Sequence, residues 1–179
     1  MNAPKARLFL VALAFGVAGV VAQRLFTSAE PQLGAPSEVR VAEVWEARLP
    51  DLAGNMQPLS QWRDKVLVLN FWAPWCPPCR EEIPDFIRLQ DRHRQAGLQF
   101  VGVALDEADR VAAFVRETGI NYPSLLGGEA GVALSMAAGN RLGGLPFTVV
   151  FDRRGNPVAT LTGGVTQARL EAIVRPLLR

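Results

Sequence analysis

The sequence contains few of the residues that build disulfide-rich or nucleic-acid-binding proteins. Its 179 residues include only two cysteines, one histidine and one tyrosine. Two cysteines form at most one disulfide, which excludes a fold held together by several of them. The net charge is only +2, and no stripe of lysine and arginine provides the clustered positive charge that binding to a nucleic acid needs. We therefore expect no nucleic-acid partner.

The length suits one domain and excludes a large multidomain enzyme, because single domains commonly contain roughly 100–200 residues. Hydrophobic residues make up 49% of the chain and charged residues 20%. This composition supplies an apolar core and argues against general disorder. The excess of positive charge lies within residues 1–40, and the remainder is balanced. One neutral domain with an amino-terminal appendage is predicted.

The amino terminus has the pattern of a membrane-targeting segment. Lys5 and Arg7 precede fifteen residues, 8–22, without a polar side chain. Basic residues before such a segment keep that end in the cytoplasm and direct the rest of the chain across the membrane. We predict a signal anchor over residues 1–26, although cleavage as a signal peptide is the alternative.

The remaining chain divides into a short linker and a folded domain. Residues 27–40 contain prolines and a glycine and predict a linker. The domain is expected over residues 41–179, where short apolar runs alternate with amphipathic stretches. This alternation is typical of an α/β sheet whose strands are joined by helices.

Two runs within the domain predict buried strands at the centre of this sheet. Residues 66–71 form an almost continuous apolar run, as expected of a strand that is covered on both faces. Residues 98–105 form a second such run. Between them, a helix is expected to begin after Cys76.

Turn-forming residues predict two β-hairpins and mark the end of the sheet. The turn at 53–55 predicts a hairpin within residues 49–59, before the main sheet. The turn at 153–156 predicts a second hairpin near the end of the chain. An amphipathic helix over residues 166–178 then closes the domain.

A Cys-x-x-Cys pair stands where the strand 66–71 ends and the helix begins. The free N–H groups of a helix N-terminus carry partial positive charge, which stabilises a thiolate on Cys76 and makes it the nucleophile. Cys79, almost one turn later, is placed to resolve a mixed disulfide and is expected to be more buried. Because Pro77 and Pro78 have no N–H, we expect only a moderate fall in the Cys76 pKa and a reducing pair.

A structural disulfide and a zinc site are the alternative uses of the two cysteines. A structural disulfide that closes a four-residue ring gains little loop entropy. A zinc site needs four ligands, and the chain adds only His93, expected to face solvent, to the two cysteines. We therefore expect no metal and no cofactor beyond the redox-active disulfide of Cys76 and Cys79.

Three features carry a resemblance to a known family. Trp75 precedes the Cys-x-x-Cys pair, Pro84 lies five residues after Cys79, and the sequence Gly-Leu-Pro-Phe-Thr occupies residues 144–148. From about residue 49 onward, the chain resembles the TlpA and ResA group of membrane-anchored oxidoreductases of the bacterial periplasm. The resemblance implies a thioredoxin-like fold, in which Pro84 kinks the active-site helix, and a periplasmic domain at the inner membrane.

The resemblance also implies where a substrate binds. Pro146 matches the cis-proline beside the disulfide, although an ordinary trans proline in a turn is the alternative. Leu145 would offer its backbone N–H and C=O to an extended substrate segment. Trp75 is predicted to form part of an apolar docking rim, whereas Trp72 is assigned to the core.

Proton transfer is assigned to Glu82. It lies three residues after Cys79 on the same helical face, where a carboxylate could exchange protons with the resolving thiol. In the family, the matching glutamate tunes the pKa values of the cysteines. The alternative is an exposed carboxylate that complements the helix dipole. Asn70 stands where thioredoxin has a buried acid, which shifts proton handling toward Glu82.

The resemblance predicts a monomeric reductase that accepts electrons from a membrane donor of the thiol–disulfide transporter type and reduces disulfides in exported proteins. Cytochrome c biogenesis is one role of this group, but Phe147 stands where its cytochrome c maturation branch has glutamate. An oxidase or isomerase is the alternative on the same fold. A peroxiredoxin-like antioxidant would need threonine in place of Ala73. A non-catalytic module that binds metals or apoproteins would not need the cysteines to cycle.

Overall fold

A computed structural model describes residues 32–34 and 39–179. The predicted signal anchor, residues 1–26, lies outside the described residues, as does most of the predicted linker 27–40. Gln32–Gly34, within that linker, forms the short strand β1. None of the helices in the described part combines the length and the apolar character needed to cross a membrane.

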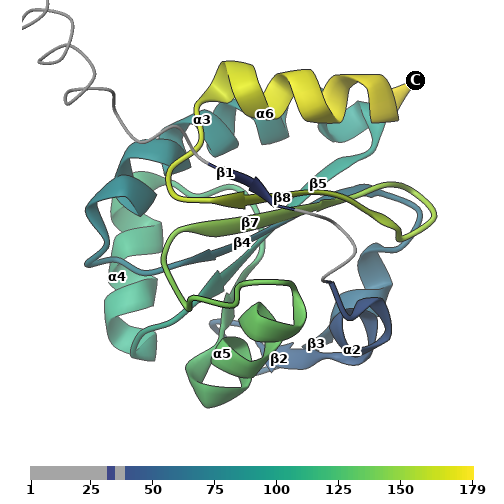
Figure 1. Ribbon diagram of the computed structural model, residues 1–179. Coiled ribbons are helices and arrows are strands. Elements are labelled where there is room, and N and C mark those ends of the chain that lie inside the picture. The colour runs from purple at the N-terminus through teal and green to yellow at the C-terminus, as the bar shows by residue number, and fades with distance from the viewer. Residues whose placement is uncertain (1–31, 35–38) are drawn as a thin grey trace, which may run out of the picture. The chain divides into compact units, whose positions relative to one another are not determined.

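A mixed sheet of six strands forms the centre of the domain, in the order β1-β8-β7-β4-β5-β6 (Figure 1). The strands β4, β5 and β6 are parallel to one another, whereas β7 is antiparallel to β4, β8 is antiparallel to β7, and β1 is antiparallel to β8. All seven residues of β4 are buried, as the apolar run predicted. The strand bounds are β4 (Val66–Trp72), β5 (Leu98–Ala104), β6 (Ser124–Leu126), β7 (Phe147–Phe151) and β8 (Pro157–Thr162).

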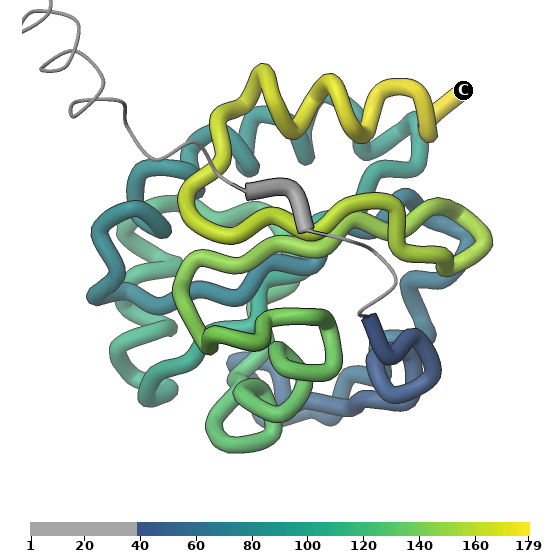
Figure 2. The backbone as a smooth tube through the Cα atoms, in the orientation of Figure 1, coloured from purple at the N-terminus to yellow at the C-terminus, as the bar shows by residue number. Residues whose placement is uncertain are grey.

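Both predicted hairpins are present. The first pairs β2 (Arg48–Pro50) with β3 (Met56–Pro58), and the second pairs β7 with β8. One aspartate closes each turn: an oxygen of Asp51 accepts from two backbone N–H groups at 2.9 Å, and Asp152 does the same in the second hairpin. The first hairpin and α2 (Val41–Glu46) lie beside α5 (Gly128–Ala137), as the tube in Figure 2 shows.

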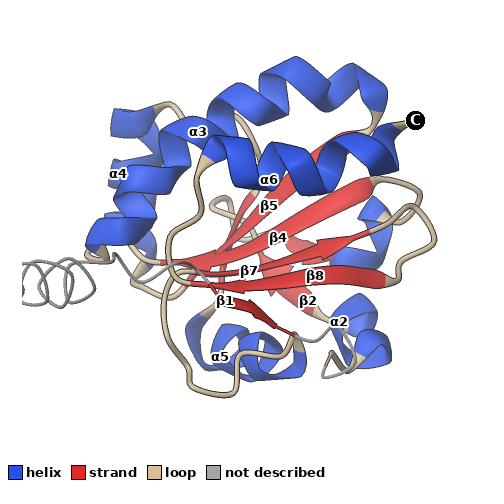
Figure 3. Cartoon of the chain, turned by 45° about the horizontal axis from the view of Figure 1, so that its top comes forward, coloured by secondary structure: helices blue, strands red, loops and turns tan. Residues whose placement is uncertain are grey.

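Helices cover both faces of the sheet (Figure 3). The helices α3 (Pro77–His93), α4 (Ala108–Thr118) and α6 (Gln167–Val174) lie on one face, and α2 and α5 lie on the other. In β4, Val66 and Val68 pack under α3 and α6, whereas Leu67 and Leu69 pack against α2 and α5. This two-sided packing explains why β4 is apolar along most of its length. The described residues also form three short 3-10 helices: η2 (Leu59–Trp62), η3 (Arg94–Ala96) and η4 (Arg175–Leu178).

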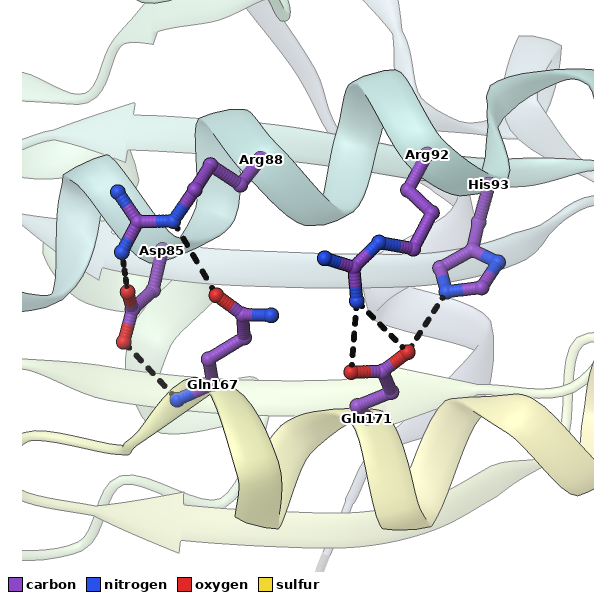
Figure 4. A network of polar contacts seen from close by, with 6 residues as sticks. All are labelled: Asp85, Arg88, Arg92, His93, Gln167 and Glu171. Carbon is purple, nitrogen blue, oxygen red and sulfur yellow. Dashed lines mark hydrogen bonds and ion pairs between the residues drawn. The ribbon is translucent and has the colours of Figure 1, made fainter.

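Polar side chains join α3 to α6 along their outer sides (Figure 4). Glu171 accepts hydrogen bonds from Arg92, at 3.1 Å to each carboxylate oxygen, and lies 3.2 Å from His93 Nε2. These contacts lower the pKa of Glu171, with the His93 contact contributing most. The His93 side chain is only 15% exposed. The expectation that His93 faces solvent is therefore wrong, because α6 packs beside it.

The helix pair is also joined nearer the start of α3. Asp85 accepts a hydrogen bond from the Gln167 backbone N–H at 2.9 Å and forms an ion pair with Arg88. Arg88 in turn donates to the Gln167 side chain at 3.2 Å. These contacts hold the first turn of α6 against α3 (Figure 4). Asp85 lies three residues after Glu82 in α3.

Candidate active site at the start of α3

The two cysteines form a disulfide at the start of α3. Cys76 is the N-cap residue, and its Cα lies 5.3 Å from that of Cys79. Pro77 and Pro78 occupy the first two helical positions, where a fixed φ suits the helix and the missing N–H removes a donor that has no partner within the helix. Cys76 is 3% exposed and Cys79 is fully buried. Cys79 is thus the more buried thiol, as predicted.

Helix α3 also contains a proline in its interior. Pro84 lies inside α3 and is exposed. Because it has no N–H, it cannot donate to the carbonyl of Arg80, one turn earlier. Ile83 and Phe86, on either side of Pro84 in sequence, are fully buried. The helix therefore keeps its apolar face under the disulfide in spite of the proline.

The Leu145–Pro146 peptide bond is cis, which confirms the prediction. The Pro146 carbonyl accepts a hydrogen bond from the Gly163 N–H at 2.9 Å. The Leu145 side chain packs against the apolar cluster that contains both cysteines. Within the described residues, neither the N–H nor the C=O of Leu145 has a hydrogen-bond partner. The loop thus places an unpaired backbone edge near the disulfide.

Tryptophans on either side of Ala73 have opposite environments. Trp72 is buried and contacts Phe114, with ring centroids 5.3 Å apart. Trp75, next to Cys76, is 64% exposed. Leu142, in the loop that leads to Pro146, is also exposed. The structure therefore places Trp72 in the core and leaves Trp75 available to a docking partner.

Glu82 is buried, with only 3% of its surface exposed, so the alternative of an exposed first-turn carboxylate is wrong. One carboxylate oxygen accepts from Asn70 Nδ2 at 2.9 Å, and the other accepts from the Val165 N–H at 3.0 Å. Burial raises the pKa of Glu82 to about 8, although both hydrogen bonds oppose the rise. A carboxyl with this pKa can both accept and release a proton near neutral pH.

Thr148 and Val165 also belong to the cluster of hydrogen bonds around Glu82 and Asn70, but the sequence did not identify them as functional residues. Asn70 Nδ2 also donates to Thr148 Oγ at 3.0 Å. Thr148 lies directly opposite Asn70 in the antiparallel pair of β4 and β7, so only the sheet register reveals the contact. Val165 contributes a backbone N–H, for which its side chain gives no signal. Glu81, by contrast, is exposed as expected.

The described part of the chain contains no group of three or more His, Cys, Asp or Glu side chains that could hold a metal ion. His93 is engaged with Glu171, on the outer side of the α3–α6 pair. The absence of a metal and of any cofactor beyond the disulfide remains a prediction.

Comparisons with known proteins identify a matching family model and named relatives of this chain. The AhpC/TSA family model matches residues 42–158. ResA, a thiol-disulfide oxidoreductase of Halalkalibacterium halodurans, is 32% identical over 124 residues, which cover 69% of this chain and 68% of that protein.

Solved structures show the same fold. A thiol:disulfide interchange protein of the thioredoxin family from Chlorobium tepidum superposes with a TM-score of 0.67 and 27% identity, over 74% of this chain and 93% of that one. A DsbF homologue from Corynebacterium diphtheriae superposes with a TM-score of 0.70 and 26% identity, over 85% of this chain and 96% of that one. These findings confirm the thioredoxin-like α/β fold. The chain therefore belongs to the AhpC/TSA family, as a TlpA- and ResA-like thiol–disulfide oxidoreductase of the thioredoxin superfamily.

Proposed function

We propose that this oxidoreductase is a periplasmic reductase of disulfides in exported proteins. The observation that carries the proposal is the Cys76–Cys79 disulfide at a helix N-terminus with the buried Glu82 carboxyl one turn further along α3. The disulfide is the oxidised product of the proposed reaction, and the reduced dithiol is the active form.

The reaction begins at the more accessible sulfur. In the reduced protein, the Cys76 thiolate attacks one sulfur of a substrate disulfide. A new bond forms between Cys76 Sγ and that sulfur, and the substrate S–S bond breaks. The other substrate sulfur leaves as a thiolate and takes up a proton. The product is a mixed disulfide on Cys76.

Release of the substrate needs the second cysteine and a base. The Cys79 thiol gives its proton to the Glu82 carboxylate, and the resulting thiolate attacks Cys76 Sγ. The Cys76–Cys79 bond forms while the bond to the substrate breaks. The second substrate thiolate is then protonated, and Glu82 can supply that proton. Two electrons have passed from the protein to the substrate, together with one proton from Cys79 through Glu82 and one proton from solvent.

Substrate recognition is assigned to the cis-proline loop and Trp75. The unpaired N–H and C=O of Leu145 can pair with an extended segment of substrate, in the manner of strand addition to a sheet edge. Cis-Pro146 fixes the direction of that backbone edge. The exposed indole of Trp75 supplies apolar contact area. Replacement of Trp75 by alanine is expected to raise KM several-fold with little change in kcat.

Electrons must return to the disulfide after each cycle. We assign this step to a membrane donor of the thiol–disulfide transporter type, which reaches a monomeric domain held at the inner membrane by residues 1–26. Apocytochromes c are one class of exported substrate. The proposal is not restricted to them, because the buried Phe147 stands where the cytochrome c maturation branch has glutamate.

The direction of electron flow is tested by the reduction potential of the Cys76–Cys79 pair, measured for the full-length chain in a glutathione buffer. Because Pro77 and Pro78 withhold two N–H donors, the thiolate is only moderately stabilised, and we expect a potential near or below about −200 mV. A potential near about −120 mV would overturn the reductase assignment in favour of an oxidase.

Turnover of a model protein disulfide tests whether the cysteines cycle. The wild-type chain should reduce it repeatedly with an external dithiol as electron source, and Cys76→Ser should reduce turnover to background. Turnover that survives Cys76→Ser would contradict the mechanism. Rapid consumption of hydrogen peroxide without reduction of the protein disulfide would instead support the peroxidase alternative.

A further inference from the structure

Three buried polar side chains lie together on the face of the sheet that α3 covers. Asn70 and Thr148 are each 1% exposed and lie opposite one another in β4 and β7, while Glu82 reaches them from α3 at 3% exposure. The mechanism above uses only Glu82. The other two residues sit in a hydrophobic interior, where a polar group is costly unless it is hydrogen-bonded.

The hydrogen bonds determine how the Asn70 amide is oriented. Its nitrogen donates one hydrogen to Glu82 and the other to Thr148, and within the described part of the chain its oxygen has no partner. The opposite orientation would place the amide oxygen against the oxygen of an ionised Glu82, so two acceptors would face each other. In the observed orientation, the Thr148 hydroxyl oxygen accepts the second hydrogen of the amide, so both hydrogens of the nitrogen that faces Glu82 are bonded.

We propose that Thr148 is a positioning residue, whose hydroxyl fixes the Asn70 amide with its nitrogen toward Glu82 and so keeps Glu82 ready to accept the Cys79 proton. The proposal rests on the role proposed for Glu82. Its physical basis is that a hydrogen bond donated to a carboxylate stabilises the ionised form. Loss of the Thr148 oxygen leaves one hydrogen of the amide without a partner, so the amide is held less firmly, its hydrogen bond to Glu82 weakens and the pKa of Glu82 rises.

Other ionisable groups also act on Glu82. The Asp85 carboxylate, on the next turn of α3, raises its pKa. The buried Tyr122 phenol, between α4 and β6, is influenced by the Glu82 charge, and its own pKa is raised mainly by burial. Cys79 is the thiol with which Glu82 exchanges a proton. None of these groups is a partner of Thr148, so a Thr148 variant changes only the amide.

The surroundings give the Glu82 proton a route to solvent. A hollow of about 190 Å³ opens between α3 and the segment before α6, lined by residues that include Pro78, Glu82 and Val165. Glu82 can therefore re-equilibrate with solvent between cycles, and its pKa sets the fraction of molecules that are ready to react. An altered pKa should appear directly in the pH profile of the release step.

The test is the pH profile of first-order release from a mixed disulfide with glutathione, measured on the full-length chain. In Thr148→Val, which keeps the shape but removes the hydroxyl, the rising limb should move by about 0.5–1 pH unit to higher pH. At pH values below the limb, release is then about 3–10-fold slower, since one unit corresponds to tenfold. At high pH, where Glu82 is ionised in both proteins, the two rates should converge.

Two further variants separate positioning from packing. Thr148→Ser restores the hydroxyl and should return the limb toward its wild-type position. Thr160→Val is the matched control, because Thr160 is a buried threonine that pairs with Val149 and so points to the other face of the sheet. Its limb should not move. If Thr148→Val does not fold, Thr148→Ala and an NMR titration of the Glu82 carboxyl carbon give the same comparison.

The outcomes distinguish this inference from the proposed function. If Glu82→Gln abolishes the limb but Thr148→Val leaves it in place, the positioning role is overturned and the base role of Glu82 stands. If Glu82→Gln keeps the limb, Glu82 is not the base, and both fail. Release slowed equally at every pH in Thr148→Val shows a structural defect and also overturns the inference.

Discussion

Two polar clusters join helix α3 to its surroundings, and the pKa values of their carboxylates are shifted in opposite directions. In the outer cluster, Glu171 meets Arg92 and His93 at the protein surface, and its pKa is lowered. In the inner cluster, Glu82 accepts two hydrogen bonds from neutral groups, and its pKa is raised to about 8. Both carboxylates are well supplied with contacts, so the number of contacts does not decide the direction of the shift.

The difference lies in the surroundings of each carboxylate. Water still solvates the outer cluster, and the hydrogen bonds of His93 and Arg92, together with the Arg92 charge, favour the charged form of Glu171. The inner cluster is almost fully buried, and the loss of hydration outweighs its hydrogen bonds. For a carboxyl that exchanges protons with a thiol near neutral pH, burial therefore sets the pKa more than hydrogen bonds do.

The strongest test of this comparison is the pH dependence of stability. The ordinary pKa of Glu82, near 4.5, applies to the unfolded chain, and the folded value is about 8. The folded protein keeps a proton that the unfolded chain releases. The stabilisation is therefore complete below about pH 4.5 and is lost as the pH rises toward 8, by at most about 5 kcal/mol. Urea unfolding of the oxidised chain across this range measures the loss.

The same experiment has an internal control. Glu82→Gln should flatten the dependence between these two pH values, and Glu171→Gln should leave it in place. The lowered pKa of Glu171 acts in the opposite direction, because its stabilisation is present above its ordinary value and is lost only as the pH falls further. A free energy of unfolding that increases from about pH 5 to about pH 8 would contradict the raised Glu82 pKa.

The rate at which the mixed disulfide is released should also differ strongly between variants of the two clusters. Glu82→Gln removes the base for Cys79, and release of the mixed disulfide at neutral pH should slow by roughly 100-fold, as is typical for loss of a general base. Glu171→Gln should leave the release rate unchanged. Equal slowing in both variants would show that the inner carboxylate has no special role.

A smaller effect is expected when the outer cluster itself is broken. Arg92 and Glu171 are partly exposed, so a double-mutant cycle with Arg92→Ala and Glu171→Ala should give a coupling energy of about 0.2–1 kcal/mol in urea unfolding. The coupling should weaken with added salt. A coupling of several kcal/mol would mean that this cluster is shielded from solvent, and the comparison would need revision.

The smallest effect should come from Asp85, which links the two clusters. Its side chain contacts Arg88 and the Gln167 N–H on the outside, yet its negative charge raises the pKa of Glu82. Asp85→Asn should therefore move the rising limb of the release rate to lower pH, by a few tenths of a unit. A shift in the opposite direction would show that Asp85 acts by positioning the segment before α6, and not by its charge.

The sequence predicted the features that depend on short stretches of chain. Cys76 and Cys79 stand at a strand–helix junction, the cis bond could only precede Pro146, and the turns at 53–55 and 153–156 marked both hairpins. Each of these follows from residues a few positions apart, whose chemistry restricts the backbone locally.

Contacts between distant segments could not be predicted in the same way. Asn70 meets Thr148 across 78 positions, Val165 meets Glu82 across 83, and Glu171 meets His93 across 78. The family resemblance assigned a role to Glu82, but its burial depends on the segment before α6. The solvent-facing prediction for His93 failed for the same reason, since nothing near residue 93 indicates that α6 packs beside it.

Two segments that precede β4 pair with strands at opposite sides of the sheet. β1 pairs with β8 at one border, and Asp51, at the end of the first hairpin, bridges to Leu125 of β6 at the other. Without these pairings, β8 and β6 would present free N–H and C=O groups, which attract strands of neighbouring molecules. We therefore expect the pairings of β1 and Asp51 to limit association of the protein through these two edges. A shortened version that begins after residue 34 would expose β8 and should self-associate more readily than one that includes β1.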